Sequence, residues 1–294
     1  MKTYKDITGD GGSNIVAQVT EQAQKLSERL ASVKHIVAVM SGKGGVGKSS
    51  VTVNLASALA LDGQAVGIVD ADINGASIAK MAGVRGQPLR IGKAGVQPAV
   101  GELGIKIMSI DLFLPEENAP VVWDAPTQKD AFTWRGMAEA NAIREFFADT
   151  EWGALDFLLI DLPPGTDKLP NIVDLLPRIS GTIIVTIPSR LSQFVVEKSI
   201  KMAREVLQAT VIGLVENMSA YVCAHCGKTE ELFPGGHLEK LASAHDIPFL
   251  GKIPFDPRMA QAADEGRLFL PENRKSPSAK AVFEITEQVK KFLD

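Results

Sequence analysis

The chain has little cysteine and no long apolar run. Its 294 residues include only two cysteines, Cys223 and Cys226, which are too close in sequence for a disulfide between them to close a useful loop. No stretch of about 18 apolar residues is present, so we expect no membrane-spanning helix. The polar start, Met1–Gly12, lacks the apolar segment of a secretory signal. These absences predict a protein of a reducing compartment, the cytoplasm, with no membrane partner.

The chain also lacks an excess of positive charge. It contains 31 Lys and Arg against 35 Asp and Glu, which gives a net charge of −4. This balance argues against a protein that coats nucleic acid, although it is compatible with a local basic patch. Hydrophobic residues make up 45% of the chain and charged residues 22%. That composition excludes a disordered chain, and the length permits a large core.

Short apolar runs alternate with segments of helical periodicity. The apolar runs are typical of buried strands and cover 35–40, 65–69, 105–110, 157–160, 182–187, 211–215 and 247–250. Helical spacing of apolar residues is found at 49–61, 138–148, 193–208 and 238–244. The alternation predicts an α/β fold, with a doubly wound, mostly parallel sheet of about seven or eight strands covered on both faces.

No linker clearly divides the chain. Residues 13–32 have helical periodicity, and we expect residues 1–33 to form an N-terminal helical extension. Residues 34–294 then form one large domain that contains the cysteine pair. Within it, residues 83–104 and 114–130 are rich in Gly, Pro and Gln and are expected to leave the sheet.

A glycine-rich segment joins the first expected strand of the domain to its first helix. It reads Ser41-Gly-Lys-Gly-Gly-Val-Gly-Lys-Ser-Ser50 and matches the phosphate-loop pattern G-x-x-x-x-G-K-[ST]. Glycines allow backbone N–H groups to approach phosphate oxygens, Lys48 reaches the β- and γ-phosphates, and Ser49 offers a hydroxyl to Mg²⁺. The pattern predicts a P-loop NTPase that binds ATP and Mg²⁺. Its nucleotide-binding residues are Gly42, Lys43, Gly44, Gly45, Val46, Gly47, Lys48, Ser49 and Ser50.

The loop carries a second lysine, Lys43. The segment Lys43-Gly-Gly-Val-Gly-Lys-Ser49 resembles the deviant Walker A ATPases, a class that includes MinD, ParA, nitrogenase iron protein and Mrp-type proteins. The resemblance implies that Lys43 crosses a dimer interface to the nucleotide of the partner. There it would neutralise charge as the γ-phosphate leaves, and so act in catalysis together with Lys48. The alternative is a solvated surface lysine.

Carboxylates follow two of the expected strands. Asp70 and Asp72 follow the strand 65–69, and Asp161 ends the apolar run 157–160. Because the carboxyl ends of strands face the nucleotide in such a sheet, Asp161 has the position of a Walker B residue that binds the Mg²⁺ shell. The resemblance assigns the attacking water to Asp72, for which a helix cap is the alternative, and leaves Asp70 structural. Gly165 can offer a backbone N–H near the γ-phosphate.

The two cysteines form a Cys-x-x-Cys turn. Its spacing lets two thiolates bind one metal centre, but a [4Fe–4S] cluster or a four-cysteine zinc site needs four. A two-fold dimer that brings two such pairs together would complete either site. The alternatives are a thiol–disulfide pair, two ordinary thiols, or a zinc site completed by one of the histidines His225, His237 and His245.

The combined motifs resemble the Mrp/ApbC-type iron–sulfur cluster carrier ATPases over residues 34–270. Besides the phosphate loop, the matching segments are Asp70-Ala-Asp-Ile-Asn-Gly75, Asp161-Leu-Pro-Pro-Gly-Thr166, Glu216-Asn-Met-Ser219, the cysteine pair with Phe233-x-Gly-Gly236, and Ile247–Arg258. The resemblance implies an ATP-hydrolysing homodimer that holds a [4Fe–4S] cluster between the Cys223 and Cys226 residues of two subunits. Its partners would be cluster-assembly donors and the apo iron–sulfur proteins that receive the cluster. The residues implied near the adenine are Asn217, Pro254 and Asp256.

Three segments depart from the family pattern. Thr166 is followed directly by Asp167, whereas the family often has Thr-Gly-Asp. The segment Trp134-Arg-Gly136 follows an apparent insertion around Asp124–Thr133, and different residues from the usual ones stand at Asn74 and Ala76. No cysteine precedes the phosphate loop, so no second cluster is expected there.

The alternative function is a positioning ATPase related to MinD or ParA, with a structural zinc at the cysteine pair. A MinD-like protein needs a basic amphipathic helix at its C-terminus. Residues 279–293 place Val282, Ile285, Val289 and Phe292 on one side, but the polar side mixes lysine with glutamate, so we expect core packing instead. A ParA-like protein needs a basic surface for DNA. Neither the membrane role nor the DNA role by itself explains Cys223 and Cys226. A zinc-stabilised dimeric ATPase does, and it is the strongest metal alternative.

Overall fold

The computed structural model describes the chain from residue 24 onward, with gaps. The described residues are 24–92, 95–114, 131–165, 179–223, 225–226, 228–233 and 238–294, with the backbone alone for 131–137, 190, 191 and 193. Within them, residues 24–30 are helical. Several predictions fall outside these residues: the helix over 13–23, the insertion around Asp124, and those for Thr166, Asp167, Gly235, Gly236 and His237.

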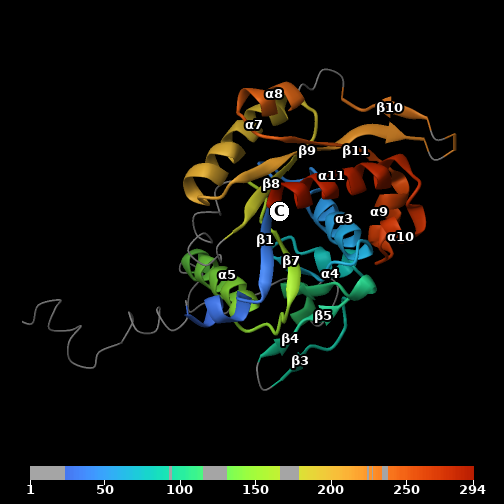
Figure 1. Cartoon of the computed structure of the whole chain (residues 1–294). Coiled ribbons are helices and arrows are strands. Elements are labelled where there is room, and N and C mark those ends of the chain that lie inside the picture. Colours follow the sequence, from blue (N-terminus) through green and yellow to red (C-terminus); the bar gives the residue numbers. More distant parts are fainter. Residues whose placement is uncertain are drawn as a thin grey trace, which may run out of the picture.

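A sheet of nine strands, counted over the described residues, forms the centre of the molecule (Figure 1). Its order is β10-β9-β8-β1-β7-β2-β6-β5, and β11 pairs with β9. The strands are β1 (Val33–Met40), β2 (Val66–Asp70), β5 (Ala99–Val100), β6 (Lys106–Met108), β7 (Leu155–Asp161), β8 (Gly181–Thr186), β9 (Val211–Val222), β10 (Thr229–Glu231) and β11 (Phe249–Phe255). All pairings are parallel except those of β5 and β10. The predicted α/β class with a mostly parallel sheet is therefore confirmed.

Each of the seven parallel strands overlaps one of the seven apolar runs of the sequence, and the bounds differ most for β9 and β11. β9 continues past residue 215 through a polar segment to Val222, and β11 begins only at Phe249. The antiparallel edge strands, β5 and β10, and the separate hairpin of β3 (Arg90–Ile91) with β4 (Val96–Gln97) have no counterpart among the predicted strands. They are two or three residues long, which is too short for a periodicity to appear.

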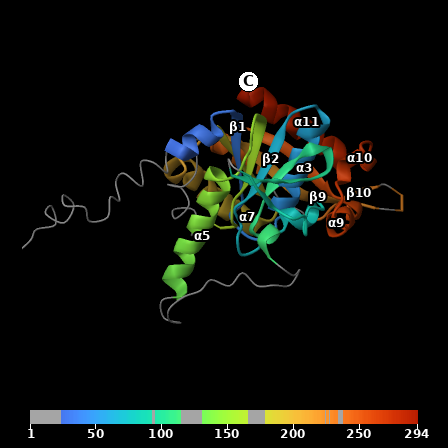
Figure 2. The same ribbon diagram turned by 90° about the horizontal axis from the view of Figure 1, so that it is seen from below.

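Helices cover both faces of the sheet (Figure 2). One apolar cluster packs α3 (Lys48–Leu61), α4 (Ile78–Met81), α9 (Pro257–Asp264), α10 (Phe269–Asn273) and α11 (Pro277–Leu293) on one face. A second cluster packs the helical segment 24–30, α5 (Ala131–Ala148), α7 (Arg190–Lys201) with its π-helical continuation η3 (Met202–Val206), and α8 (Leu238–Ala244) on the other. The 3₁₀ turns η1 (Glu102–Gly104) and η2 (Ile110–Phe113) flank β6. This is the doubly wound arrangement expected from the sequence.

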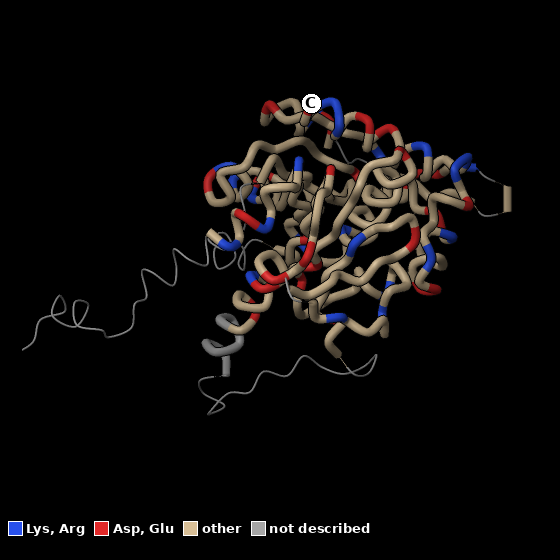
Figure 3. Tube along the Cα trace, turned by 60° about the horizontal axis from the view of Figure 1, so that its bottom comes forward, with Lys and Arg blue, Asp and Glu red and all other residues tan. Residues whose placement is uncertain are grey.

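The C-terminal helix α11 packs its apolar side into the core. Val282, Ile285 and Val289 are buried in the same cluster as α3, which is itself apolar and buried on most sides. Acidic and basic residues are interspersed along the described trace, including α11 (Figure 3). No described helix is long and apolar enough to cross a membrane.

The carboxyl ends of β1, β2 and β7 lie next to one another in the sheet. Val39 of β1 and Asp70 of β2 are both register partners of Asp161 on β7. The segments that follow these strands, including the phosphate loop, therefore meet at one edge of the sheet, as the topology of a parallel sheet requires.

The packing of α11 generates a prediction about stability. Ile285 is 1% exposed, whereas Ile91 on β3 is 85% exposed. We expect Ile285→Ala to lower the free energy of unfolding by about 2–5 kcal/mol, because it removes buried apolar surface and leaves a cavity. The same substitution at Ile91 is expected to change it by less than about 0.5 kcal/mol. Urea unfolding followed by circular dichroism measures both; equal effects would contradict the packing described.

Candidate nucleotide and metal site

The phosphate loop is a tight turn between β1 and α3 in which several glycines are required. Gly45 and Gly47 have φ angles of 76° and 80°, in the left-handed region that favours glycine. A Cβ atom on Gly42 would stand 2.2 Å from Cγ1 of Val195 on α7. The loop thus packs closely against α7 at Gly42. The glycines at positions 42, 45 and 47 leave the backbone there without side chains, so its N–H groups can approach a ligand.

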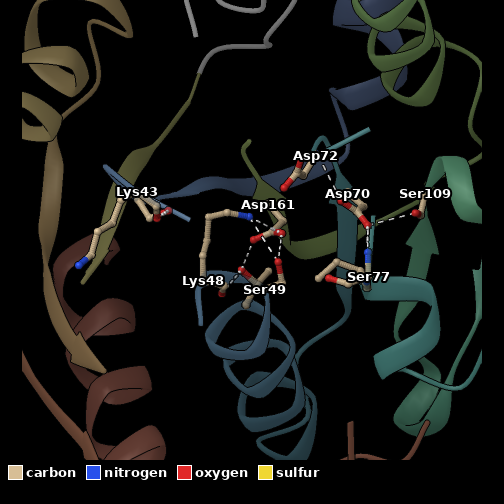
Figure 4. A network of polar contacts seen from close by, with 11 residues as sticks. Lys43, Lys48, Ser49, Asp70, Asp72, Ser77, Ser109 and Asp161 are labelled. Carbon is tan, nitrogen blue, oxygen red and sulfur yellow. Dashed lines mark hydrogen bonds and ion pairs between the residues drawn. The ribbon is translucent and has the colours of Figure 1, made fainter. Parts of the chain in front are cut away.

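One buried carboxylate organises the start of α3 (Figure 4). Oδ2 of Asp161 lies 2.6 Å from Nζ of Lys48 and accepts a hydrogen bond of 2.6 Å from the hydroxyl of Ser49. The other oxygen, Oδ1, accepts a hydrogen bond of 2.7 Å from Thr52. Asp161 is fully buried and Lys48 is 5% exposed. The geometry brings together the lysine and hydroxyl of the phosphate loop and the predicted Walker B carboxylate.

A second buried carboxylate, Asp70, fixes the loop that carries Asp72. Its Oδ1 accepts from the N–H of Asp72 at 3.2 Å. Its Oδ2 accepts from the N–H groups of Ser77 and Ile78 at the start of α4, and from the hydroxyl of Ser109 beyond β6. Burial, and then the nearby charge of Asp161, raise the pKa of Asp70 to about 7. These hydrogen bonds fix the backbone around Asp72, and a structural role for Asp70 stays a prediction.

Lys43 and Asp72 lie on opposite sides of the Lys48–Asp161 pair (Figure 4). Both side chains are half-buried. The side chain of Lys43 points away from the pair, whereas Asp72 lies close to it. Gly165, which follows β7, has a φ angle of 86° and donates its N–H to the carbonyl of Ser41 at 2.9 Å. Gly165 is therefore hydrogen-bonded to the start of the phosphate loop, and Lys43 points away from the Lys48–Asp161 pair of its own chain.

The residues expected near the adenine occupy different environments. Asn217 is buried against the phosphate loop, where its Nδ2 donates to the carbonyl of Val46 at 2.8 Å. Pro254 turns its carbonyl to the hydroxyl of Ser278 on α11. Asp256 caps the start of α9 and forms a bidentate ion pair with Arg258, so its carboxylate is already occupied by described partners. Of the three, only Asn217 contacts the phosphate loop in the described structure; adenine contacts remain a prediction for all three.

The cysteine pair occupies the turn that follows β9. Cys223 comes directly after the strand, and its N–H donates to the carbonyl of Lys228, just before β10, at 2.9 Å. Cys223 is half-buried and Cys226 is exposed, and both thiols are free. Hydrogen bonds from the backbone of Cys226 and His225 lower the pKa of the Cys223 thiol, which favours the thiolate that binds metals.

The histidine-completed zinc site has no support in the described residues. No group of three or more His, Cys, Asp or Glu side chains that could hold a metal is formed among them. His245 lies at the end of α8, where its Nε2 is 3.9 Å from Glu197 on α7. Among the described residues, Cys223 and Cys226 therefore have no third ligand of these types grouped with them, and His237 lies outside the described residues.

Two residues of the site were not singled out from the sequence. Thr52 follows Lys48 and Ser49 by one helical turn and so faces the same carboxylate, and Ser109 reaches Asp70 from β6. Thr52 could have been found from its spacing on the helix, since residues three and four apart share a face. Ser109 had no local signal, because its contact joins two distant segments.

Comparison with known proteins identifies the family. A family model described as NUBPL iron-transfer P-loop NTPase matches residues 32–290. The chain belongs to this family. The iron–sulfur cluster carrier protein of Saccharolobus solfataricus is 43% identical over 282 residues, which cover 94% of this chain and 91% of that protein. The cytosolic Fe–S cluster assembly factor NUBP2 of Bos taurus is 39% identical over 265 residues, 88% of this chain and 93% of that protein.

Solved structures agree with this assignment. A nucleotide-binding protein of Archaeoglobus fulgidus in complex with ADP has 37% identity and a TM-score of 0.72, and the match covers 88% of this chain and 95% of that one. The septum site-determining protein MinD of Pyrococcus horikoshii, in complex with Mg-ADP, has 22% identity and a TM-score of 0.60, over 88% and 96% of the two chains. The second likeness concerns the fold alone. The iron-transfer NTPase and MinD thus share the P-loop architecture described above.

The environment of Asp70 generates a prediction about pH. Because the pKa of Asp70 is about 7 in the folded state and 3.8 ordinarily, the folded chain retains a proton that the unfolded chain has lost between these values. Its contribution to stability is therefore present at low pH and is lost as the pH rises from about 4 to about 7. Asp70→Asn cannot titrate, so the stability of the wild type relative to this variant should fall between about pH 4 and about pH 7 and change little above that.

Urea unfolding of both proteins across this range, without nucleotide, measures the difference. Asp161 and Lys48, the charged groups that act on Asp70, are present in both. Ser109→Ala serves as the control, because it removes one hydrogen bond to Asp70 and leaves the carboxyl in place. Its stability should follow the pH slope of the wild type. Parallel curves for the wild type and Asp70→Asn would contradict the raised pKa.

Proposed function

We propose that the protein is an ATP-hydrolysing carrier that binds a [4Fe–4S] cluster at the interface of a homodimer and transfers it to apo iron–sulfur proteins. The observation that carries the proposal is that one chain holds both a complete phosphate loop and a pair of free thiols, one of them exposed, which would form half of a cluster site. Membership of the iron-transfer P-loop NTPases supports it.

The side chains around Asp161 suit the binding of Mg²⁺ and a nucleoside triphosphate. Ser49 and Asp161 present oxygen atoms 2.6 Å apart, and oxygen ligands are those that Mg²⁺ prefers. Mg²⁺ bound there would supply positive charge beside Asp161 and shield the phosphates. Lys48 would then exchange the carboxylate for the β- and γ-phosphates, and Asp72 would orient the attacking water.

Lys43 would complete the site of the other subunit. Its side chain points away from the Lys48–Asp161 pair of its own chain, as a residue acting in trans must (Figure 4). A positive charge brought to the γ-phosphate by a partner stabilises the charge that develops as the phosphate leaves. Hydrolysis would thus depend on the dimer.

The cluster would be cargo held by four thiolates, two from each chain. Cys223 and Cys226 lie on a turn with at least one exposed thiol, so a second copy can approach them. The partners would be cluster-assembly donors and apo iron–sulfur proteins. We also propose residence in the cytoplasm, supported by the bovine relative, whose name describes a cytosolic assembly factor.

Anaerobic reconstitution of the full chain with iron and sulfide tests the cluster. We expect about four iron and four sulfide per two chains, with the absorbance of an iron–sulfur cluster. Cys226→Ser should lose this uptake because it removes one of the two ligands that each chain supplies. His225→Ala, a change in the same turn, should retain it. Stable binding of zinc with no uptake of iron by the wild type would overturn the cluster proposal.

The role of Lys43 is tested by ATP hydrolysis. Lys43→Ala should lower the rate by about a hundredfold or more, given that charge supplied in trans is worth roughly 10³–10⁵ in related phosphoryl transfer. Lys201→Ala, at an exposed lysine on α7, is the control and should have the rate of the wild type.

A mixing experiment separates action in trans from action within the chain. Lys48→Ala should also be inactive, because it lacks the lysine that binds the phosphates. A mixture of Lys43→Ala with Lys48→Ala should regain activity, since a mixed dimer contains one site with both lysines. Wild-type activity of Lys43→Ala alone, or no recovery in the mixture although mixed dimers form, would refute the trans role.

A further inference from the structure

A single strand, β9, connects the phosphate loop to the cysteine pair. Near its middle, Asn217 donates its hydrogen bond to Val46 of the loop. At its end, residues 220–222 pair with β10, and Cys223 follows directly. The two sites proposed to act together are therefore joined by six residues of continuous backbone, from Asn217 to Val222.

The contact between β9 and the loop is closely packed. A Cβ atom on Gly47 would stand 2.3 Å from Nδ2 of Asn217 and 3.3 Å from Cε of Met218. Gly47 is therefore packed against these two side chains, and a displacement of the loop toward β9 would move them. Close-packed interiors transmit such displacements instead of absorbing them.

β9 has an irregular backbone directly after this contact. Met218 has a φ angle of 53°, in the left-handed region that a methionine rarely adopts. On the neighbouring strand β11, Ile253 pairs with Asn217 and Phe255 pairs with Tyr221. Three residues of β9 thus lie opposite one residue of β11, which is a bulge. Bulges bend a strand and loosen its pairing, and strained residues are found where a structure has a functional reason to retain them.

The bulge divides β9 into two parts. The part before it lies inside the sheet between β8 and β11 and is buried from Val211 to Asn217. The part after it pairs with β10 over three residues, and the rings of Tyr221 and Phe255 stack with their centroids 6.5 Å apart. We call residues 220–222, β10 and the two cysteines between them the cysteine hairpin. This hairpin has fewer contacts with the sheet than the first part of β9, and a hinge at Met218 could reorient it.

We propose that Met218 is a positioning residue that couples the phosphate loop to the cysteine hairpin. A nucleotide that moves Val46 and Gly47 moves Asn217 and Met218, and the bulge converts this movement into a change in the exposure of the thiols. The inference rests on the proposed function, because it describes how that nucleotide site regulates that cluster site. It assigns the coupling to contacts within one chain.

The rate of thiol modification measures this coupling. The chain has only two cysteines, so an aromatic disulfide reagent, which releases a coloured thiolate when it reacts with a thiol, reports on the hairpin alone. The reduced, metal-free full chain is mixed with the reagent in the presence of Mg²⁺ with ADP, with a non-hydrolysable ATP analogue, or with no nucleotide. For the wild type we expect the rate to change by about fivefold or more between these conditions, which is the lower range of ordinary allosteric coupling.

Met218→Gly should abolish this dependence on nucleotide. Glycine adopts the left-handed backbone without strain and lacks the thioether that reaches Gly47. Gln208→Gly is the matched control, because Gln208 also has a positive φ angle, 47°, but lies before β9 and away from the loop. It should respond to nucleotide as the wild type does. Binding of a fluorescent nucleotide verifies that each variant still takes up the ligand.

A second variant at position 218 keeps the test possible if Met218→Gly does not fold. If Met218→Gly fails to fold by circular dichroism, Met218→Asn retains a residue that tolerates the left-handed region but does not extend as far as the thioether. Its nucleotide dependence should also be lost. The proposal is overturned if the wild type shows no dependence, or if a folded Met218 variant that binds nucleotide keeps the wild-type ratio. Failure of iron uptake in reconstitution would instead refute the proposed carrier, whatever the thiol rates show.

Discussion

The buried charge of Asp161 is the constraint on which the site depends. A carboxylate with no exposure to water is costly unless it is paired and hydrogen-bonded, and here Lys48, Ser49 and Thr52 provide both. These contacts tie the end of β7 to the start of α3, the helix that follows the phosphate loop, and so fix the position of that end of the loop. They also set a condition on any ligand. If phosphates attract Lys48, another positive charge has to replace it beside Asp161, and Mg²⁺ bound with a nucleotide would supply that charge.

The sheet explains how two different chemistries occur on one chain. Parallel strands deliver the phosphate loop and both carboxylates to one edge, where backbone and side chains are held by a core on each face. β9 belongs to the same sheet but continues beyond it, and only its last residues, with β10, form the cysteine hairpin. The same strand therefore contacts the phosphate loop through Asn217 and leads into the cysteine turn at its end, with the irregular backbone of Met218 between them.

The sequence was sufficient to predict those features whose residue pattern is local. The parallel strands are buried on both faces, which makes them apolar runs, and the phosphate loop has a fixed spacing of glycine, lysine and serine. The sequence was insufficient for features that depend on contacts between residues far apart in the chain. The segment Glu216–Ser219 is polar and does not look like a strand, yet pairing with β11 extends β9 through it. The roles of Ser109 and of the N–H of Gly165 depend on partners far away in the sequence, Asp70 and Ser41. No periodicity records such pairs.

Under the proposed function, both sites would be incomplete in one chain, and for independent physical reasons. Two thiolates leave half the coordination of a four-sulfur centre open, and a lysine that points away from its own phosphate site cannot neutralise charge there. A two-fold dimer satisfies both requirements with the same operation, since each chain supplies to the other what it cannot supply to itself. In the proposed dimer, hydrolysis followed by release of the phosphate would remove the charge that attracts the partner's lysine and so weaken one of the interactions between the subunits. The four-thiolate site would then lose support when the nucleotide is spent, which links the chemistry of the phosphate loop to the release of the cluster.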